Sequence, residues 1–494
     1  MVIPTSVTEM KDYIFNGCSN LTTVSLPNTI TSMGGSNFSQ CTSLTTVNIP
    51  TLLTTIPGGT FYKCSSLADI DIPETITDIE SSAFAYCTSM TSIFIPATVT
   101  QIRSHAFEGS TNLEKVITPD LAAWCAIDYS GGNADSNPLY HAKHLYVGSK
   151  ASNTEVTDLV IPNGVEEIKR LTFYNCEGLT SITIPATITT IGNWGYNPFH
   201  GCTNVAAIYC LAEPFAKWEG NDDADAFMPE KATKFYVEDP TAWETAWPDA
   251  NVTFTNDLLL NETDDNSTLI ALWNGKTMNV TLTRTLKAGS YNTFAVPFDI
   301  DAATLSAKGI TAKRLTATTL TGGTLSITFD DATAIEAGKP YLVKVAADVV
   351  NPVFENAMVS SFATPATTSY VDFVPTLGKT LVTGSAGYED DVKSVLILGA
   401  ANTLYHPSVV NDATQEASYM KGFRAYFQLH GDAVGTPVLR LDFGDNRNTT
   451  GISLTSDSTT LTTDSWYTLD GRKLQGKPTA KGVYINNGKT YIVK

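Results

Sequence analysis

Cysteine is the residue type whose spacing in this sequence first suggests chemistry. Six of the eight cysteines take the same place in a pattern with a basic interval of 23 residues: Cys18, Cys41, Cys64, Cys87, Cys176 and Cys202. A zinc site needs clustered ligands such as a C-x-x-C pair, and a column with one thiol per repeat offers none. We therefore expect buried, unreactive thiols that pack like small hydrophobic side chains, with disulfides as the less favoured alternative. Cys125 and Cys210 lie off this spacing, and nothing in the sequence pairs them.

Histidines and carboxylates form no recognisable catalytic or metal-binding motif. His141 and His144 are the one close pair among six histidines, and no carboxylate motif completes a metal site beside them. Asp69 and Asp71 lie together, but carboxylate pairs are common in so acidic a chain and do not indicate glycosidase chemistry. Residues 221–225 (NDDAD) offer oxygen ligands for calcium, yet they lack the glycine and the distal glutamate of an EF-hand loop. The sequence therefore predicts no catalytic residue, no metal ligand and no cofactor.

Charge and hydropathy exclude two classes of protein. The 494 residues include 31 basic and 50 acidic ones, a net charge of −19, whereas a nucleic-acid binder needs a basic surface. Most of the excess lies in residues 1–255, which carry 27 acidic and 11 basic residues. No run of 18 apolar residues predicts a transmembrane helix. The first 30 residues lack the pattern of a leader peptide, so we expect the natural protein to carry a leader, and further repeats, upstream of Met1.

The elements that would position any functional residue are set by an internal repeat of 23 residues. Prolines mark it at eight places: Pro4, Pro27, Pro50, Pro73, Pro96, Pro119, Pro162 and Pro185. Within residues 21–41, the L-x-x-V-x-L spacing is the strand signature of leucine-rich repeats. Alternation along that strand buries Val24 and Leu26 and turns Thr23 and Ser25 outward. The last repeat is three residues longer, which predicts an insertion around residues 193–198. We expect the repeats to stack into a solenoid, because none can bury its apolar side chains alone.

The pattern I-P-x-x-V-x-x-I-x-x-x-A-F-x-x-C-x-x-L-x-x-V, clearest in residues 72–93 and 161–182, resembles the BspA-type leucine-rich repeat family. An irregular block at residues 120–161 is similar to the long repeat that interrupts such arrays, and residues 234–247 resemble their closing repeat. The resemblance covers residues 1–255. It implies a solenoid with a parallel concave sheet in a bacterial surface protein, and some members of the family are implicated in adhesion.

Beyond the solenoid the sequence predicts two further β-rich parts. The polar stretch 261–267 reads as a linker, and short alternating segments separated by Gly, Pro, Asn and Asp predict an antiparallel sandwich over residues 256–446. Its strings AGKPYLVK and FRAYFQL resemble β-domains of Bacteroidetes surface proteins. Residues 447–494 contain two Asx-Gly turn signals, Asp470-Gly471 and Asn487-Gly488, which predict a small module of β-hairpins. This tail resembles C-terminal sorting modules of exported Bacteroidetes proteins.

The concave sheet of the solenoid is the predicted binding surface. Its outward residues are small and polar in the early repeats, then charged, then apolar. We single out Asp69, Asp71, Ser92, Phe94, Lys115, Ile117 and Tyr209. An exposed Phe94 beside Ile117 has no folding rationale, so these residues, with the insertion around Trp124 and Tyr129, are interpreted as a partner-binding patch. The alternative is that the insertion folds over Phe94 and Ile117 and buries them.

Together these features predict a monomeric, exported or cell-surface protein that is not an enzyme. It would bind a host or bacterial surface protein or a glycan through residues 1–255, with the β-rich parts as spacer or anchor. Two other functions remain open: a structural or assembly component of the cell envelope, and a hydrolase with its site in residues 256–446.

Overall fold

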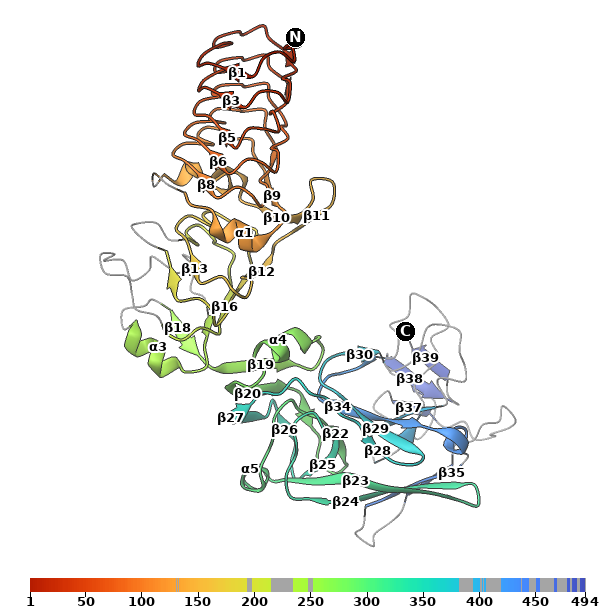
Figure 1. Ribbon diagram of the computed structural model, residues 1–494. Coiled ribbons are helices and arrows are strands. Elements are labelled where there is room, and N and C mark those ends of the chain that lie inside the picture. Colours follow the sequence, from red (N-terminus) through yellow and green to blue (C-terminus); the bar gives the residue numbers. More distant parts are fainter. Residues whose placement is uncertain are drawn as a thin grey trace. The chain divides into compact units, whose positions relative to one another are not determined.

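The computed structural model contains two compact units, Met1–Asn256 and Asp257–Lys494, each of which is described by itself (Figure 1). The structure describes the chain except for several segments. These are residues 130, 132, 193–197, 215–233, 248–251, 382–393, 400–401, 403, 406–418, 437, 444–449, 454–465, 469–477, 480–481, 487–488 and 494. The run 221–225 and both Asx-Gly turns of the tail lie outside the described residues.

The first unit is the predicted solenoid, and its coils stack along one axis in Figure 1. The strands of the first column begin with β2 (Thr23–Val24), β4 (Thr46–Val47), β7 (Ser92–Phe94), β9 (Lys115–Thr118) and β10 (Leu145–Gly148). They continue with β11 (Asn153–Glu155), β12 (Asp158–Val160), β14 (Ser181–Ile184), β16 (Ala207–Cys210), β17 (Lys234–Tyr236) and β18 (Thr253–Thr255). Most of them pair in parallel with the equivalent strand of the next coil, so Thr23 lies opposite Thr46 and Ser92 opposite Lys115.

A second column of short strands, which the sequence patterns did not predict, runs along another side of the coils. It comprises β1 (Glu9–Met10), β3 (Ser32–Met33), β5 (Thr55–Ile56), β6 (Asp78–Ile79), β8 (Gln101–Ile102), β13 (Glu167–Ile168) and β15 (Thr190–Ile191). Here too pairing is parallel at a spacing of 23 residues, as for Thr55 and Asp78. In the first column Ser181 pairs with Ala207, 26 residues on. This register confirms the three-residue insertion, although residues 193–197 lie outside the described part.

Two repeating ladders run through the interior of the solenoid, among buried aliphatic side chains. Phenylalanine rings stack from coil to coil, with centroids 5.5 Å apart for Phe15 and Phe38 and 5.4 Å for Phe61 and Phe84. Beside them the Cys64 thiol donates to the carbonyl of Phe38 in the previous coil, with 3.0 Å between Sγ and O. All eight cysteines are free thiols, and every one except Cys18 is buried. The expectation of buried, unpaired thiols is therefore confirmed for five of the six repeat cysteines, and Cys18 is exposed.

The long repeat at residues 120–161 carries the helices α1 (Leu121–Ala126), η1 (Ala134–Ser136) and α2 (Leu139–Ala142) in addition to β10 and β11. Asp120 caps α1 by accepting from the backbone N–H of Ala122 at 2.7 Å. The fully buried Trp124 donates from its indole Nε1 to the carbonyl of Thr172 at 2.9 Å. The irregular block is thus packed against the next coil as part of the solenoid core. Helix α3 (Pro240–Ala246) lies between β17 and β18.

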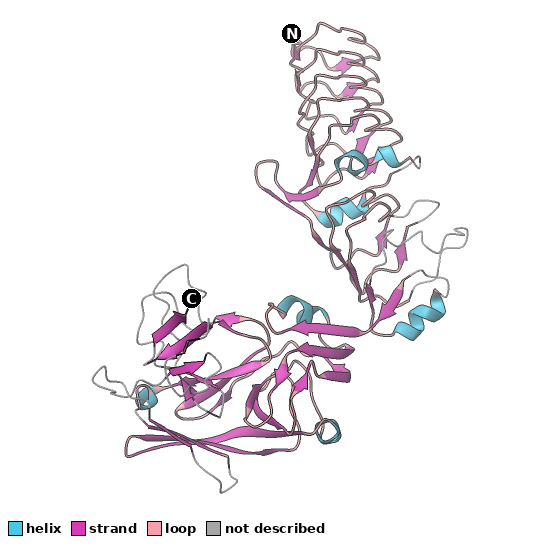
Figure 2. Ribbon diagram, turned by 180° about the vertical axis from the view of Figure 1, so that it is seen from behind, coloured by secondary structure: helices cyan, strands magenta, loops and turns pink. Residues whose placement is uncertain are grey.

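The second unit contains two main sheets (Figure 2). The larger has the order β22 (Asn292–Phe294), β25 (Tyr341–Val345), β23 (Ile310–Thr321), β24 (Thr324–Ala332), β35 (Val438–Asp442) and β36 (Thr450–Ser453). The other has the order β28 (Ala366–Thr367), β29 (Val371–Thr376), β34 (Arg424–Leu429), β31 (Val395–Leu398) and β32 (Leu404–Tyr405). One buried cluster joins both sheets, with Phe329 packing against Phe373 and Phe427. This is a sandwich, as predicted, but its larger sheet is mixed and not purely antiparallel, because β24 and β35 pair in parallel.

The remaining elements of this unit lie outside these two sheets. They are β19 (Asp257–Asn261), α4 (Ser267–Leu272), β20 (Thr277–Thr283), β21 (Thr285–Leu286), α5 (Ala302–Ala307), β26 (Val349–Val350), β27 (Val353–Met358), β30 (Thr380–Leu381), β33 (Tyr419–Met420), η3 (Gly431–Ala433), β37 (Trp466–Thr468), β38 (Gly482–Asn486) and β39 (Lys489–Val493). No helix in the described ranges is long and apolar enough to cross a membrane.

Two details of the second unit differ from the sequence interpretation. The stretch 261–267 is not a linker: it joins β19 to α4, and the buried Asn266 donates to the carbonyl of Asn261 at 2.8 Å. A polar turn whose side chains form hydrogen bonds with its own backbone groups has the same composition as a linker, which explains the error. Strand β36 pairs with β35 of the sandwich, whereas β37, β38 and β39 form an antiparallel sheet of their own. The boundary at residue 447 stays a prediction.

Candidate recognition surface

The front face of the solenoid is the set of outward side chains on β2, β4, β7 and β9 and on the segment 68–72 between β4 and β7. This face arises because successive side chains of a strand point to opposite sides, so every second side chain of these segments enters the core and the others point outward. In the early coils the outward residues Thr23 and Thr46 are exposed. The side chains of Asp69 and Asp71 follow, with 57% and 89% of their surface exposed. The expectation of small polar residues followed by charged ones is met here.

The apolar part of the predicted patch is only partly exposed. Ser92, Phe94 and Lys115 are half-buried, and only 3% of Ile117 is exposed. The pairing of β7, β9 and β10 aligns Phe94 with Ile117 and Ile117 with Tyr146. The patch interpretation required an exposed Ile117, and the structure shows that this residue is buried. For this residue the alternative of burial by the insertion holds.

The covering element is an antiparallel hairpin formed by β10 and β11, which projects from the coils in Figure 1. Its turn brings the Lys150 ammonium to 2.7 Å from Asp69 Oδ2 and to 2.6 Å from Asp71 Oδ1. Strands β7 and β9 lie between β10 and the coil of Asp69, so the hairpin leans back over the front of these two strands. Partial burial lowers the pKa of Lys150, but the two carboxylates outweigh burial and raise the pKa overall.

Lys115 is held beneath this hairpin. Its ammonium lies 4.1 Å from the centroid of the Tyr146 ring and donates to Asn153 Oδ1 at 3.3 Å. The Tyr146 hydroxyl donates to Glu155 at 3.3 Å, and burial together with that carboxylate raises the pKa of Tyr146. Contacts from both strands of the hairpin thus enclose the Lys115 side chain.

Tyr209, the last of the residues singled out, lies on a different sheet. It belongs to β16, in the sheet of β12, β14, β16, β17 and β18, and its ring stacks on Tyr236 with 5.1 Å between centroids. Burial raises the pKa of Tyr209. The structure therefore brings the other six residues into one region and leaves Tyr209 in a second one.

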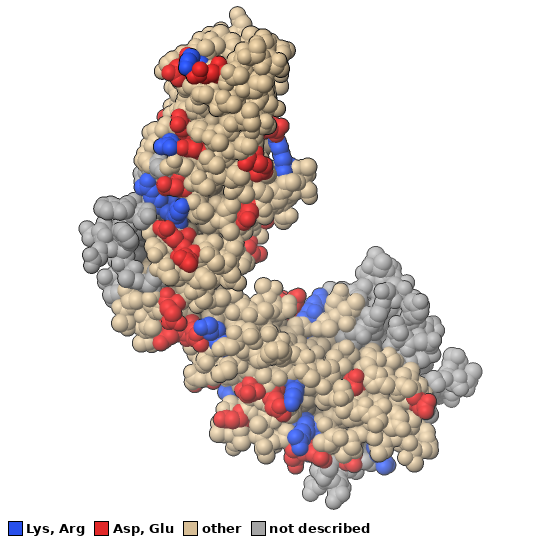
Figure 3. All heavy atoms as spheres, in the orientation of Figure 1, with Lys and Arg blue, Asp and Glu red and all other residues tan. Residues whose placement is uncertain are grey.

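The charged side chains of the solenoid gather along its two edges in the view of Figure 3, and the surface between them carries few charges. Negative and positive groups are interspersed along the left edge, whereas the right edge is mostly acidic. The bulk charge of the first unit therefore does not form one continuous acidic surface in this view.

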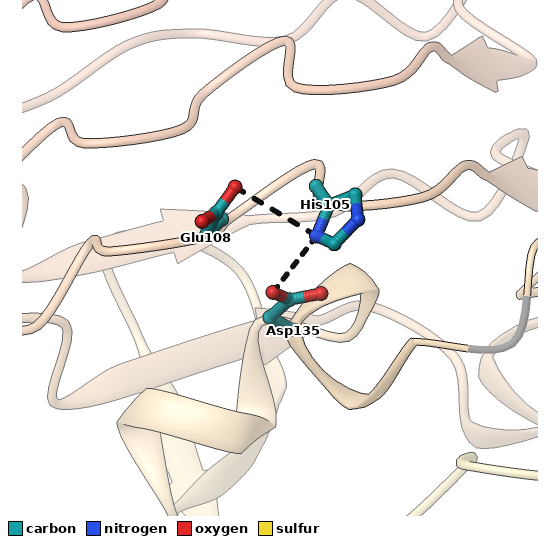
Figure 4. Close-up of side chains that lie close together, drawn as sticks. All are labelled: His105, Glu108 and Asp135. Carbon is teal, nitrogen blue, oxygen red and sulfur yellow. Dashed lines mark hydrogen bonds and ion pairs between the residues drawn. The ribbon is translucent and has the colours of Figure 1, made fainter.

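One cluster of metal-ligating side chains was missed by sequence reasoning. His105, Glu108 and Asp135 place one ligand atom each within 4.8 Å of one another (Figure 4). The Nδ1 atom of His105 lies 3.0 Å from Asp135 Oδ2 and 3.7 Å from Glu108 Oε2. The H-x-x-E spacing of the first two residues was a signal in the sequence. Asp135 comes from η1 of the long repeat, and no periodicity indicates that it reaches the same place.

The buried thiols offer no nucleophile. Burial raises the pKa of Cys41 to about 11 and the pKa of Cys87 and Cys125 to about 12. A thiol with so high a pKa is protonated at neutral pH, and the thiolate is the reactive form. The repeat cysteines therefore serve packing.

A protein-family model matches the first unit. Its description is the BspA type Leucine rich repeat region, and six copies of it match within residues 1–114 and 148–213. The gap between the two ranges, residues 115–147, falls on the end of the fifth repeat and most of the long repeat. The sandwich and the tail lie outside the match.

Solved structures with similarity to this chain include several leucine-rich repeat proteins. A leucine-rich repeat protein of Bacteroides ovatus is 20% identical, with 53% of this chain and 87% of that chain covered and a TM-score of 0.26. A leucine rich cell surface protein of Faecalibacterium prausnitzii is also 20% identical, with 51% and 86% covered and a TM-score of 0.24. The Leucine Rich Repeat protein of T. pallidum is 23% identical, with 42% and 77% covered and a TM-score of 0.26. A search of curated proteins gave no match.

Proposed function

The solenoid of this chain belongs to the BspA-type leucine-rich repeat family, and from this premise we propose that the protein is a non-catalytic recognition protein that binds a protein or glycan through its front face. Proteins of this family are typically exported or displayed on the bacterial surface, and we propose the same location for this chain. The partner is the part of the proposal that needs an experiment.

The observation that carries the proposal is the row of exposed side chains on a rigid backbone. Thr23, Thr46 and Asp71 point outward from successive coils that are hydrogen-bonded or stacked on one another. Strands of a sheet are about 4.8 Å apart, so these positions form an extended and regularly spaced surface. Their outward side chains are not needed for packing, because the inward ones fill the core.

The chemistry of the front face favours a polar partner. Its exposed groups are hydroxyls in the early coils and two carboxylates at Asp69 and Asp71, with the Lys150 ammonium between them. Hydroxyl-rich glycans and polar protein segments can both hydrogen-bond to such groups. The stacked tyrosines at Tyr209 and Tyr236 add an aromatic surface on a different sheet.

Arrays of host-matrix proteins and of glycans, probed with the full chain, test the proposal. We expect saturable binding to members of one array and no turnover of the bound molecule. Absence of binding to both arrays, together with self-association of the chain, would favour the structural role in the envelope. Cleavage of a glycan or peptide by the chain would favour a hydrolase.

A further inference from the structure

The cluster of His105, Glu108 and Asp135 lies outside the front face and is not explained by recognition there. Its three side chains meet from two segments: His105 and Glu108 belong to one turn of the fifth repeat, and Asp135 belongs to η1. A backbone hydrogen bond of 3.1 Å from the N–H of Phe107 to the carbonyl of Asp135 joins these segments. The backbone therefore holds the side chains near one another. We propose that they bind a divalent transition-metal ion, Zn²⁺, through one imidazole nitrogen and two carboxylates.

The distances suit an ion of this kind. Zinc binds histidine nitrogen and carboxylate oxygen at roughly 2.0–2.2 Å, which places the ligand atoms of a tetrahedral site about 3.3 Å apart. His105 Nδ1 lies 3.0 Å from Asp135 Oδ2 and 3.7 Å from Glu108 Oε2. All three ligand atoms lie within 4.8 Å of one another, so a small rotation of the Glu108 side chain completes the triangle. A fourth position is left for water or for a group of a binding partner.

The charges around the cluster favour a cation. Two carboxylates converge here, and their ion pairs within the described ranges are with His105. A divalent ion would neutralise both carboxylates at once.

Unpaired polar atoms are a second and independent sign that a ligand belongs at this place. Among the described residues, the Oδ1 atom of Asp135 is buried without a hydrogen-bond partner, and so is the hydroxyl of the next residue, Ser136, which is fully buried. A buried carboxylate oxygen without a partner costs free energy that a bound ion would recover. Asp135 can use this oxygen as a second donor to the metal.

Neighbouring side chains already orient the ligands. The Tyr86 hydroxyl donates to Glu108 Oε1 at 2.7 Å, which leaves Oε2 directed at His105. The amide nitrogen of Asn133 lies 2.6 Å from His105 Nε2 and 3.3 Å from His105 Nδ1, so it packs against the imidazole ring. Such outer partners of a metal-binding histidine fix its tautomer and orientation.

Isothermal titration of the full chain with ZnCl₂, after dialysis against a chelator, tests the proposal. We expect one site per chain. The variants His105→Gln and Asp135→Asn should each weaken binding by at least about tenfold, because each removes a ligand or its charge. The matched control is His144→Gln, since His144 pairs with a single carboxylate, Glu155, at 2.7 Å. This variant should bind as tightly as the unchanged protein.

Two outcomes would overturn the proposal: no binding of Zn²⁺ by the unchanged chain, or equal binding by both variants. Circular dichroism of each variant separates loss of the ligand from loss of the fold. Because His105 is partly exposed, His105→Gln should keep the fold even if Asp135→Asn does not. A rise in the unfolding temperature with Zn²⁺, absent in His105→Gln, would be a second readout of the same site.

Discussion

Cys64 shows how one position of the repeat serves packing and hydrogen bonding together. Its thiol fills the core and donates to the carbonyl of Phe38 at 3.0 Å. Ser110 occupies the same position of a later repeat, and its hydroxyl donates to the carbonyl of Phe84 at 2.8 Å. The repeat spacing predicted burial at this position, but periodicity contains no information about where a thiol proton points. The common role of Cys and Ser becomes visible only in the structure.

Serine should therefore replace cysteine here better than alanine does. Cys64→Ala removes the sulfur and the hydrogen bond, so we expect it to lower the free energy of unfolding by about 1–3 kcal/mol. Cys64→Ser keeps a donor, as at Ser110, and should cost less. Urea denaturation of the full chain, followed by tryptophan fluorescence, measures both, since five of the seven tryptophans belong to the first unit. An alanine variant at least as stable as the serine variant would contradict this account.

The same thiols make the solenoid sensitive to alkali. Burial raises the pKa of Cys87, Cys176 and Cys210 to about 12, from an ordinary value of 9.0. Above pH 9 the unfolded chain loses protons that the folded chain keeps, which stabilises the unfolded state. The stability contributed by these thiols is thus fully present below pH 9 and is lost as the pH rises toward 12.

Urea midpoints measured between pH 7 and pH 11 check this dependence. We expect a decline that begins near pH 9 and is less steep in Cys87→Ser, which lacks one titrating thiol. Midpoints that stay constant up to pH 11 would show that the thiols do not titrate differently in the two states.

At the scale of elements, the β10–β11 hairpin is the feature that the sequence did not reveal. The block at 120–161 was recognised as irregular. The 23-residue spacing of the other repeats contains no information about an antiparallel strand such as β11, so the hairpin could not be predicted from it. The contact of Lys150 with Asp69 joins residues 81 positions apart. It therefore depends on how the coils stack, and this is also why Ile117 is buried although alternation places it outward.

Removing the Lys150 ammonium should loosen the turn of this hairpin without unfolding the coils. The ion pairs are largely exposed, so Lys150→Ala should change global stability by less than about 1 kcal/mol. Amide hydrogen exchange of residues 149–152 should become faster, while that of β3 and β5 stays the same. Lys143→Ala is the matched control. Lys143 forms an ion pair with Glu177 at 2.6 Å, and its side chain is about as exposed as that of Lys150. Exchange in the turn that is equal in both variants would mean that Lys150 does not hold it.

At the scale of the whole molecule, the first unit was far more predictable than the second. The solenoid repeats one local rule, so Pro27 and Val24 in one coil predict the strand and its register in the next. The sandwich has no such repetition. Its long strand β23 (Ile310–Thr321) was missed because its outer half, rich in threonine, is exposed or half-buried on both sides and shows no alternation. The pairing of β24 with the distant β35 is likewise a tertiary feature.

The central claim is that the front face of the solenoid binds the partner. Thr46 on β4 and Ser32 on β3 are both exposed hydroxyl residues on short strands of neighbouring coils, but they lie on the two different strand columns. The most direct measurement is the Kd of the strongest binder from the arrays for the full chain, Thr46→Arg and Ser32→Arg. We predict that Thr46→Arg weakens binding at least about tenfold, or about 1.4 kcal/mol, and that Ser32→Arg leaves it unchanged. Equal affinity of all three proteins, or loss with Ser32→Arg alone, would contradict the claim.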